Sequence, residues 1–290
     1  MTPRALILQT SAAFRRFGIP DPETDAAFLL SYLTGRPPLE LRMDMDHSLP
    51  PETIKAYEEL CHERENRIPL QYLMHYQYFN GHQYHVDSRV LIPRPETAEI
   101  VSFLIERFSS SHGLRVLDLC CGSGCIGIEL SLSLQEATVT CADLSLDALS
   151  VAKRNAENLG AIVNFAQGDL FNAVPDQIFD LIVSNPPYIP SSECDVIQPE
   201  VAFEPRMALD GGTDGLDFYR AIISNASSHL SPGGMIAFEI GEGEAEYIVD
   251  LLREASFDSI LIRNDFSGID RMIAAFKPQE VLSCSKDLNS

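Results

Sequence analysis

Over residues 1–73 the apolar positions recur every three or four residues, which predicts amphipathic helices. One helix is expected to start at Asp21 and Pro22, residue types that favour a helix N-terminus, and to end at Gly35, which favours a C-terminus. A more polar helix is expected over residues 51–67. Together these segments predict a small helical bundle.

The pattern changes over residues 74–93, where polar and apolar positions alternate and aromatic residues are frequent. Asn80-Gly81 stands at the centre of this segment and is the strongest short signal for a two-residue β-turn. We therefore predict a β-hairpin that links the bundle to a second lobe.

The second lobe, residues 94–280, alternates short apolar runs with helix-like segments, which is typical of a mostly parallel sheet covered on both faces. Only residues 265–270 join the last two runs, too few for a crossover helix, so this pair is expected to be antiparallel. The seven predicted strands are residues 115–120, 137–143, 162–167, 179–184, 235–240, 259–264 and 271–277.

These elements predict the fold class. It is an α/β fold with a seven-stranded, mostly parallel, Rossmann-like sheet that carries a terminal antiparallel hairpin. A β-hairpin joins this sheet to the small N-terminal helical bundle. Residues 281–290 are expected to form a flexible tail.

Composition narrows the class of protein. Of the 290 residues 45% are hydrophobic, which is enough for a core, and no apolar stretch approaches the roughly 20 residues needed to span a bilayer. The N-terminus shows no long apolar segment followed by a cleavage site. We expect a soluble, cytoplasmic, monomeric protein with no membrane partner.

Seven cysteines are an odd number, and three of them crowd together as Cys120, Cys121 and Cys125. Secreted disulfide scaffolds are short and spread their cysteines along the chain. No histidine stands nearby at the spacing of a metal ligand. We therefore expect buried, reduced thiols and no metal.

The net charge of −21 is unevenly distributed. Residues 1–73 carry 8 basic and 11 acidic side chains, so the remaining residues hold −18 of the total. Affinity for nucleic acid depends largely on neutralising phosphates, so this acidic lobe argues against direct binding of DNA or RNA. A simpler explanation of the excess carboxylates is solubility.

A small-residue turn follows the first predicted strand of the sheet. It reads Asp118-x-Cys120-x-Gly122-x-Gly124, and glycines at such a turn let the backbone approach a ligand. A pyrophosphate cofactor requires a different glycine spacing, G-x-G-x-x-G. The acid in front of the turn suits a nucleoside cofactor without phosphates, although many α/β proteins also turn on small residues.

Two further acids follow the next two strands. Asp143 comes about 20 residues after the glycines, where a carboxylate can accept hydrogen bonds from two ribose hydroxyls. Asp143 could instead cap the following helix, but Ser145 already fits that role. Asp169 could hold an adenine amino group with Leu170 beside the ring, or it could belong to an ordinary Gly-Asp turn.

The fourth strand ends abruptly at Asn185-Pro186-Pro187-Tyr188. An amide nitrogen is a poor nucleophile, and two acceptors that bind its two N–H groups can orient it and favour localisation of its lone pair. The Asn185 side-chain oxygen and the Pro186 carbonyl are suitable acceptors, because the prolines have fixed φ and the turn stays stiff. Tyr188 can stack on the flat amide. Asn-Pro also starts ordinary turns.

On these motifs the sequence resembles the S-adenosylmethionine-dependent methyltransferases, and more closely the bacterial peptide-chain release factor glutamine methyltransferases. The resemblance runs nearly from end to end. The matching motifs are Pro93–Thr97, Asp118–Gly124, Asp143, Gly168–Phe171, Asn185–Tyr188, Phe203–Tyr219 and Gly268–Arg271.

The resemblance implies a methyl transfer from S-adenosylmethionine, without a metal, to the side-chain amide of a glutamine in a protein. It implies the Gly-Gly-Gln loop of class 1 release factors as the substrate, with residues 1–73 as the docking lobe and residues 94–280 as the methyltransferase domain. It implies Asn185, Pro186 and Tyr188 as catalytic residues, with Pro187 also binding substrate. The implied cofactor-binding residues are Asp118, Cys120, Cys121, Gly122, Ser123, Gly124, Asp143, Asp169, Leu170 and Asn185.

The sequence departs from the family at a few positions. Cys120 stands where the family usually has glycine, so this residue must adopt a negative φ or accept mild strain, and Cys121 often is threonine in the family. After Glu239-Ile240-Gly241 the family commonly has an aromatic residue and a glutamine, which are absent here.

Several roles and functions stay open. Arg94, Glu96 and Thr97 either order a loop over the cofactor or simply start a helix, and Glu204 and Arg206 either shape a substrate groove or form ion pairs. The alternative functions are a ribosomal-protein glutamine methyltransferase and, with less support, a nucleic-acid amino-group methyltransferase. A non-catalytic nucleoside-binding adaptor and a dinucleotide oxidoreductase fit the motifs less well.

Overall fold

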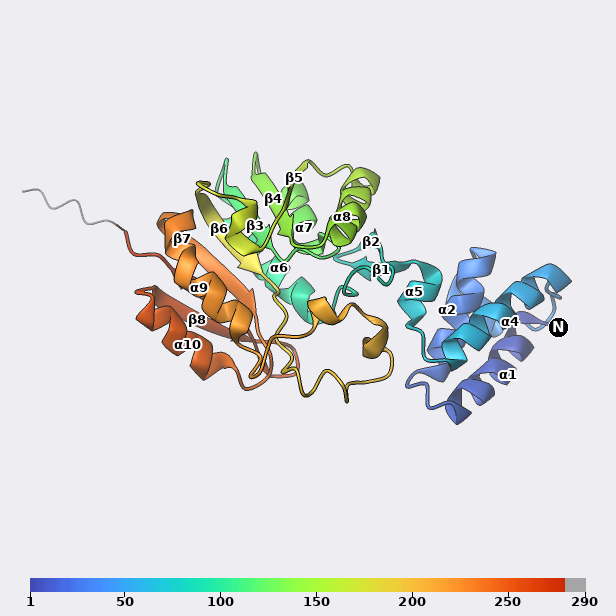
Figure 1. The fold of residues 1–290 in the computed structure, drawn as a ribbon. Coiled ribbons are helices and arrows are strands. Elements are labelled where there is room, and N and C mark those ends of the chain that lie inside the picture. Colours follow the sequence, from blue (N-terminus) through green and yellow to red (C-terminus); the bar gives the residue numbers. More distant parts are fainter. Residues whose placement is uncertain (280–290) are drawn as a thin grey trace, which may run out of the picture.

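The computed structural model describes residues 1–279, which form two lobes (Figure 1). The tail predicted over residues 281–290 lies outside the described residues. The N-terminal lobe is a helical bundle, as predicted. Its helices are α1 (Pro3–Arg16), α2 (Pro22–Thr34), α3 (Pro38–Met43), α4 (Pro51–Glu65) and α5 (Leu70–Met74).

The periodic segments of the sequence correspond to α1, α2 and α4, and Gly35 ends α2 in the left-handed conformation with a φ of 68°. The short helices α3 and α5 were not predicted, because five or six residues are too few to show a helical period. The bundle has its own core, in which Phe14, Leu29 and Tyr57 are fully buried. The buried Tyr57 hydroxyl donates a hydrogen bond of 2.9 Å to the Ala26 carbonyl.

The predicted β-hairpin lies between the lobes. It consists of β1 (Tyr76–Phe79) and β2 (His82–His85). Asn80 and Gly81 both have positive φ, 46° and 82°, which the two-residue turn requires. The side chain of buried Asn155 accepts from the His85 N–H at 2.7 Å and donates to the His85 carbonyl at 3.0 Å, so the hairpin is attached to the second lobe.

The second lobe is built on the predicted seven-stranded sheet. Its strands are β3 (Arg115–Leu119), β4 (Thr138–Asp143), β5 (Val163–Gln167), β6 (Phe179–Ser184), β7 (Leu230–Glu239), β8 (Asp258–Asn264) and β9 (Asp270–Phe276). They lie in the order β5-β4-β3-β6-β7-β9-β8. The first five pair in parallel, whereas β9 is antiparallel to both β7 and β8, which confirms the predicted terminal hairpin.

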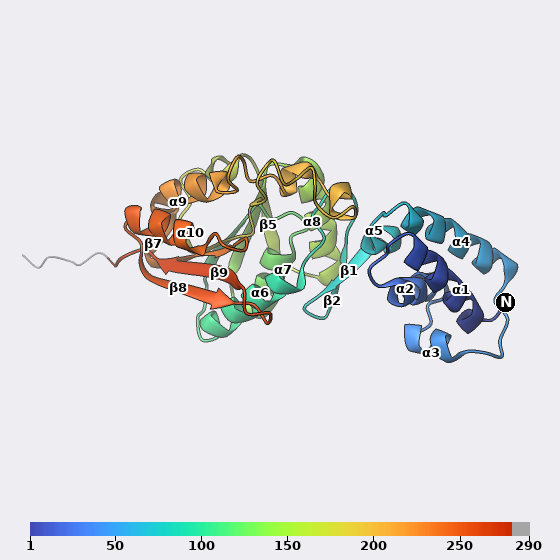
Figure 2. The same ribbon diagram turned by 90° about the horizontal axis from the view of Figure 1, so that it is seen from below.

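Helices cover both faces of the sheet (Figure 2). One face packs against α6 (Pro95–Phe108), α7 (Cys125–Ser133) and α8 (Leu146–Leu159); the other packs against α9 (Asp217–His229) and α10 (Ala245–Glu254). Side chains alternate accordingly: Val116 belongs to the first core, and Leu117 to the second. Short 3-10 helices, η1 (Leu170–Ala173), η2 (Val201–Phe203) and η3 (Arg206–Ala208), occur in the loops.

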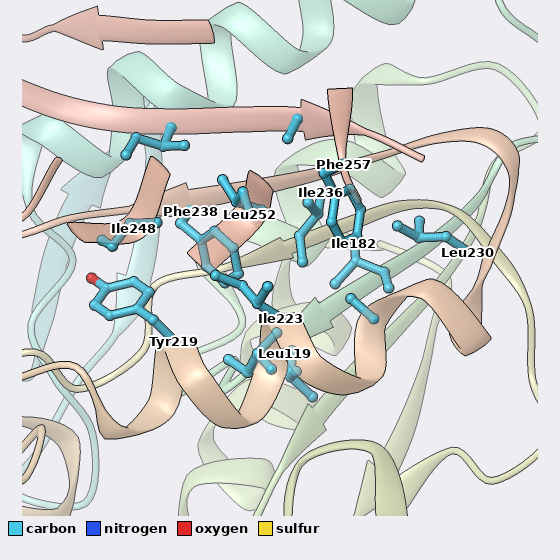
Figure 3. Close-up of a cluster of buried hydrophobic side chains, with 14 of the residues drawn as sticks. Leu119, Ile182, Tyr219, Ile223, Leu230, Ile236, Phe238, Ile248, Leu252 and Phe257 are labelled. Carbon is cyan, nitrogen blue, oxygen red and sulfur yellow. The ribbon is translucent and has the colours of Figure 1, made fainter. Parts of the chain in front are cut away.

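The core beneath α9 and α10 gathers large side chains from the sheet and both helices (Figure 3). Ile182 and Phe238 are fully buried there, and the Tyr219 ring meets Phe238 edge-on at 5.4 Å between centroids. The Tyr219 hydroxyl donates a hydrogen bond of 2.8 Å to the Glu239 carbonyl, so burial leaves it with a partner. This packing holds the end of β7 in place. No helix among residues 1–279 is both long and apolar enough to span a membrane.

An ion-pair cluster connects the bundle to the long connection between β6 and β7. Glu200, on that connection, accepts from Arg64 at 2.9 Å and from Arg67 at 2.6 Å. The Arg64 side chain is only 4% exposed and also donates to Asp25 at 2.8 Å. Because a buried guanidinium without a partner is costly, these contacts constrain how the two lobes sit together.

We expect Glu200→Ala to lower the free energy of unfolding of the bundle by about 1–3 kcal/mol, because it removes the carboxylate partner of Arg67 and one of the two carboxylate partners of the buried Arg64. Denaturant unfolding measures the effect. Glu193→Ala is the matched control, since Glu193 is exposed on the same connection and its loss is expected to cost less than about 0.5 kcal/mol. Equal effects of the two substitutions contradict the prediction.

Candidate active site

The carboxyl ends of β5, β4, β3 and β6 meet at one edge of the sheet, because these strands are parallel neighbours. A cavity of about 220 Å³ opens there. It is lined by parts of residues 89–97, 119–126, 142–148, 168–170 and 185–218. Such an edge is the usual ligand site of an open α/β sheet, and three residues predicted from the strand ends, Asp143, Asp169 and Asn185, line the cavity.

The turn between β3 and α7 has an unusual backbone. Cys120, Gly122 and Gly124 all have positive φ, of 62°, 52° and 78°. Cys120 therefore adopts the strained alternative rather than a negative φ, at a cost of about 1–3 kcal/mol. Gly124 packs so tightly that an added Cβ would lie 3.0 Å from the Ala152 Cβ. Cys120, Cys121, Gly122 and Ser123 line the cavity, whereas Gly124 does not.

Asp143 lines the cavity and also holds the turns around it. One of its carboxylate oxygens accepts from the Gly122 N–H and the other from the Ser145 N–H, both at 2.9 Å. Ser145 is the N-cap of α8 and accepts from the Ala148 N–H at 3.1 Å, as expected. Burial raises the pKa of Asp143. Each carboxylate oxygen still has a lone pair for a further donor, which two hydroxyl groups of a ligand can use.

Asp118 lies behind the turn and not in the cavity. It is completely buried, and its Oδ2 accepts from the Gly127 N–H at 2.8 Å. An added Cβ on Gly127 would lie 2.4 Å from the Cys141 sulfur, so only glycine lets α7 approach the strand this closely. Asp118 Oδ1 has no hydrogen-bond partner among the described residues. Asp118 therefore supports the turn from behind, and the cofactor-binding role that the family resemblance implies for it stays a prediction.

Asp169 and Leu170 line the cavity beyond β5. Leu170 has a φ of 47°, a strained value for a branched side chain. The Gly168 N–H donates to the Asp143 carbonyl at 3.1 Å, which ties this loop to the end of β4. An added Cβ on Gly168 would lie 2.7 Å from the backbone of Ala173. The loop is thus held against the cavity by close backbone packing.

The Asn185–Tyr188 turn divides between two environments. Asn185 and Pro187 line the cavity, whereas Pro186 and Tyr188 do not. The Pro186 carbonyl accepts no hydrogen bond from residues 1–279, so its capacity as an acceptor is not used within the described chain. Tyr188 lies beside a separate hollow with Glu244, and burial raises its pKa. The expected stacking of Tyr188 on a substrate amide therefore stays a prediction.

The chain after this turn is fixed against the Phe203–Tyr219 block. The Ile189 N–H donates to the Leu209 carbonyl at 2.9 Å, and the Gly211 N–H donates back to Ile189 at 2.8 Å. An added Cβ on Gly211 would lie 2.7 Å from the Tyr188 Cα, so the two segments pack backbone to backbone. The geometry of the turn therefore depends on residues far along the chain.

The residues with open roles form ion pairs. Glu204, only 5% exposed, pairs with Arg94 and accepts from the Ile92 N–H at 2.9 Å. Burial raises the pKa of Glu204, and Arg94 opposes that effect. Arg94 and Thr97 line the cavity at the start of α6. Arg206, which does not line the cavity, pairs instead with the exposed Asp195 and with Asp210, and Asp210 does line the cavity.

Sequence reasoning missed part of the lining. The residues concerned are Arg89, Val90, Leu91, Pro93, Met207, Ala208 and Phe218. Four of them, Pro93, Met207, Ala208 and Phe218, belong to motifs that carry the family resemblance. Most lie on connections without a regular hydrophobic period, and Phe218 lies in the first turn of α9. Among residues 1–279 no group of three or more His, Cys, Asp or Glu side chains is arranged to hold a metal.

The fold and the site define a methyltransferase. A family model described as the Methyltransferase small domain matches residues 99–202, and one described as the PrmC N-terminal domain matches residues 5–74. A methyltransferase structure from Pyrococcus furiosus, 19% identical with a TM-score of 0.53, covers 69% of this chain and 90% of its own length, and shows the shared fold alone.

Relatives narrow the class further. The release factor glutamine methyltransferase of Geobacter sulfurreducens is 40% identical over 94% of this chain and 95% of its own length. That of Chlorobaculum tepidum is 39% identical over 92% of this chain and 94% of its own length. The chain therefore belongs to the release factor glutamine methyltransferase family.

Buried carboxyl groups near the cavity, but not lining it, predict the pH dependence of stability. Burial raises the pKa of Asp118, Glu239 and Glu244 to about 7, against about 4 in an unfolded chain. The folded state therefore binds more protons than the unfolded state between about pH 4 and pH 7. Hence we expect the free energy of unfolding to rise as the pH falls through this window.

Denaturant unfolding between pH 8 and pH 5 measures this slope. Asp118→Asn should flatten the slope, because it removes one of the three groups and keeps an oxygen for the Gly127 N–H. A stability that falls on acidification in this range, or an unchanged slope in the variant, contradicts the prediction.

Proposed function

We propose that this protein transfers a methyl group from S-adenosylmethionine to the side-chain amide nitrogen of a glutamine in the Gly-Gly-Gln loop of class 1 peptide-chain release factors. The observation that carries the proposal is the position of Asn185. Its side chain lines the same cavity as Asp143 and the Cys120–Ser123 turn. One acceptor for an amide, Asn185 Oδ1, thus lies beside the proposed nucleoside site, and the Pro186 carbonyl that follows it in the chain is proposed as the second.

The cavity fits S-adenosylmethionine. Asp143 can accept from two ribose hydroxyls, and Asp169 with Leu170 can hold an adenine through its amino group and ring face. The cofactor supplies an electrophilic methyl group on a sulfonium, and S-adenosylhomocysteine is the product. The turn at Cys120–Ser123 brings backbone, not long side chains, close to the ligand.

The reactive nitrogen needs orientation more than a strong base. Asn185 Oδ1 and the Pro186 carbonyl each accept one of its N–H groups, which aims the lone pair and favours pyramidalisation as the new bond forms. The locked φ of Pro186 and Pro187 keeps this pair of acceptors rigid. The methylated amide then loses its proton to water, so no histidine or glutamate is required as a general base.

The helical bundle supports the choice of a protein substrate. Leu39 and Met43 are each 69% exposed and Met45 is 61% exposed, an apolar set that a partner protein can cover. The excess of negative charge disfavours nucleic acid as a direct substrate. We therefore assign docking of the release factor to residues 1–73, and place the enzyme, as a monomer, in the cytoplasm where translation terminates.

The test is transfer of a labelled methyl group to purified release factor, ribosomal protein, DNA and RNA. We expect label only on the release factor, and none when its loop glutamine is replaced. Label on ribosomal protein or on nucleic acid in place of the release factor overturns the assignment of substrate.

We expect Asn185→Ala to lower the transfer rate at least about a hundredfold, because one of the two acceptors for the amide is lost. Cofactor binding, measured by calorimetry, should stay nearly unchanged. Asn225→Ala is the matched control, since Asn225 is exposed on α9 and bonds only within that helix. Turnover retained in Asn185→Ala contradicts the proposed geometry.

A further inference from the structure

Glu239 is a buried carboxylate that the proposed reaction does not use. It is the last residue of β7 and is 2% exposed. It does not line the cavity, but it lies directly behind residues that do. Unused buried carboxylates are costly unless they are paired, so its partners indicate its task.

A chain of hydrogen bonds leads from Glu239 to the cavity. The Thr97 hydroxyl donates to Glu239 Oε2 at 2.5 Å. The Asn185 Nδ2 donates to Thr97 Oγ1 at 3.4 Å. Thr97 is itself 2% exposed, so water does not compete for these bonds. The three side chains come from the start of α6, the end of β6 and the end of β7, and nothing in local sequence links them.

The donors and acceptors in this row of hydrogen bonds are fixed, because an ionised carboxylate can only accept a hydrogen bond. Glu239 accepts a hydrogen bond from the hydroxyl group of Thr97, which has only one O–H to donate. Thr97 Oγ1 can therefore only accept a hydrogen bond from Asn185. The Asn185 amide must then turn its NH₂ group toward Thr97 and its oxygen away. In the opposite rotamer the amide oxygen would face Thr97 Oγ1 without a hydrogen bond, because the Thr97 O–H already donates to Glu239.

From this geometry we infer that Glu239, acting through Thr97, is a positioning residue that presents Asn185 Oδ1 to the substrate amide. This inference deepens the proposed function and rests on it. A neutral Glu239 can donate, which permits Thr97 to donate in turn to Asn185 Oδ1. The amide is then free to flip and to show its NH₂ group to the substrate, where an acceptor is needed.

The surroundings of Glu239 set the pH at which it becomes protonated and the Asn185 amide becomes free to flip. Burial raises the pKa of Glu239 to about 7, with Thr97, Arg271 and Asn185 opposing and Glu96 reinforcing the rise. The other titratable groups that face it are Tyr188, Cys125 and Tyr219. We therefore expect the turnover number to fall as the pH drops through about 7, at saturating cofactor and release factor.

The test uses Glu239→Gln, whose amide can donate and accept and so no longer enforces a direction. At pH 8 we expect kcat to fall roughly tenfold or more, with the cofactor Kd and the KM for release factor within about twofold. The acid limb of the pH profile should disappear. A wild-type kcat and pH profile in this variant overturns the inference.

Thr97 supplies a pair of matched variants. Thr97→Val removes the hydroxyl at constant shape and should lower kcat as much as Glu239→Gln does. Thr97→Ser keeps the hydroxyl and should keep a kcat close to that of the wild-type protein. Because the residues act in series, the double variant Thr97→Val/Glu239→Gln should be no slower than either single one. Additive losses of kcat in the double variant, or a kcat in Thr97→Ser as low as in Thr97→Val, overturn the inference.

Glu129→Gln is the control for neutralising a buried carboxylate. Glu129 is 3% exposed and accepts from His82 and Tyr84, both at 2.8 Å, on the hairpin side of the lobe and outside the cavity. It should change neither kcat nor the pH profile. A loss equal to that of Glu239→Gln means a structural effect and overturns the inference.

A second readout does not depend on the identity of the substrate. The side-chain ¹H–¹⁵N signals of Asn185, assigned by their loss in Asn185→Ser, should titrate near pH 7 in the wild-type protein and stay flat in Glu239→Gln. Signals that do not titrate overturn the inference. If the wild-type protein leaves release factor unlabelled while these signals titrate, the proposed substrate fails and the positioning role stands.

Discussion

The Asp143 carboxylate is the interaction on which the site depends. Its two oxygens accept from the Gly122 and Ser145 N–H groups, and its backbone carbonyl accepts from Gly168. One residue thereby joins the loops that follow β3, β4 and β5. Apolar side chains of these loops, such as Cys121 and Phe171, pack into the cores beneath them. Burial thus holds each loop against the sheet, and Asp143 holds the loops to one another. A ligand hydroxyl that binds Asp143 meets a group already held in place.

The turn after β6 is constrained from three directions. Its continuation pairs with Leu209 and Gly211, its first side chain reaches Thr97 on α6, and its connection is attached to the bundle through Glu200. Glu204 adds a buried link from the same connection to Arg94. The turn that carries the proposed acceptors for a substrate amide is thus connected by these contacts to the lobe proposed to bind the substrate protein.

The sequence predicted the elements better than the contacts. All seven strands and the Asn80-Gly81 hairpin were correct, because alternation and turn chemistry are local properties. The short helices α3 and α5 were not predicted, because they are too short to show a hydrophobic period. The position of Asp118 at a strand end was predicted, whereas only the structure shows that its side chain lies behind the turn, because a local pattern does not give the direction of a side chain.

The sequence by itself determined the fold class and the strand ends at which the cavity lies, because each follows from patterns among neighbouring residues. The role of Asn185 and Pro186 as a pair of acceptors is a proposal that rests on the same local pattern. Only the tertiary structure decided that Cys120 accepts a left-handed backbone, that Tyr188 lies beside a second hollow, and that Glu239 stands behind Asn185. These facts depend on pairings between residues up to 142 positions apart, which packing selects and no local pattern encodes.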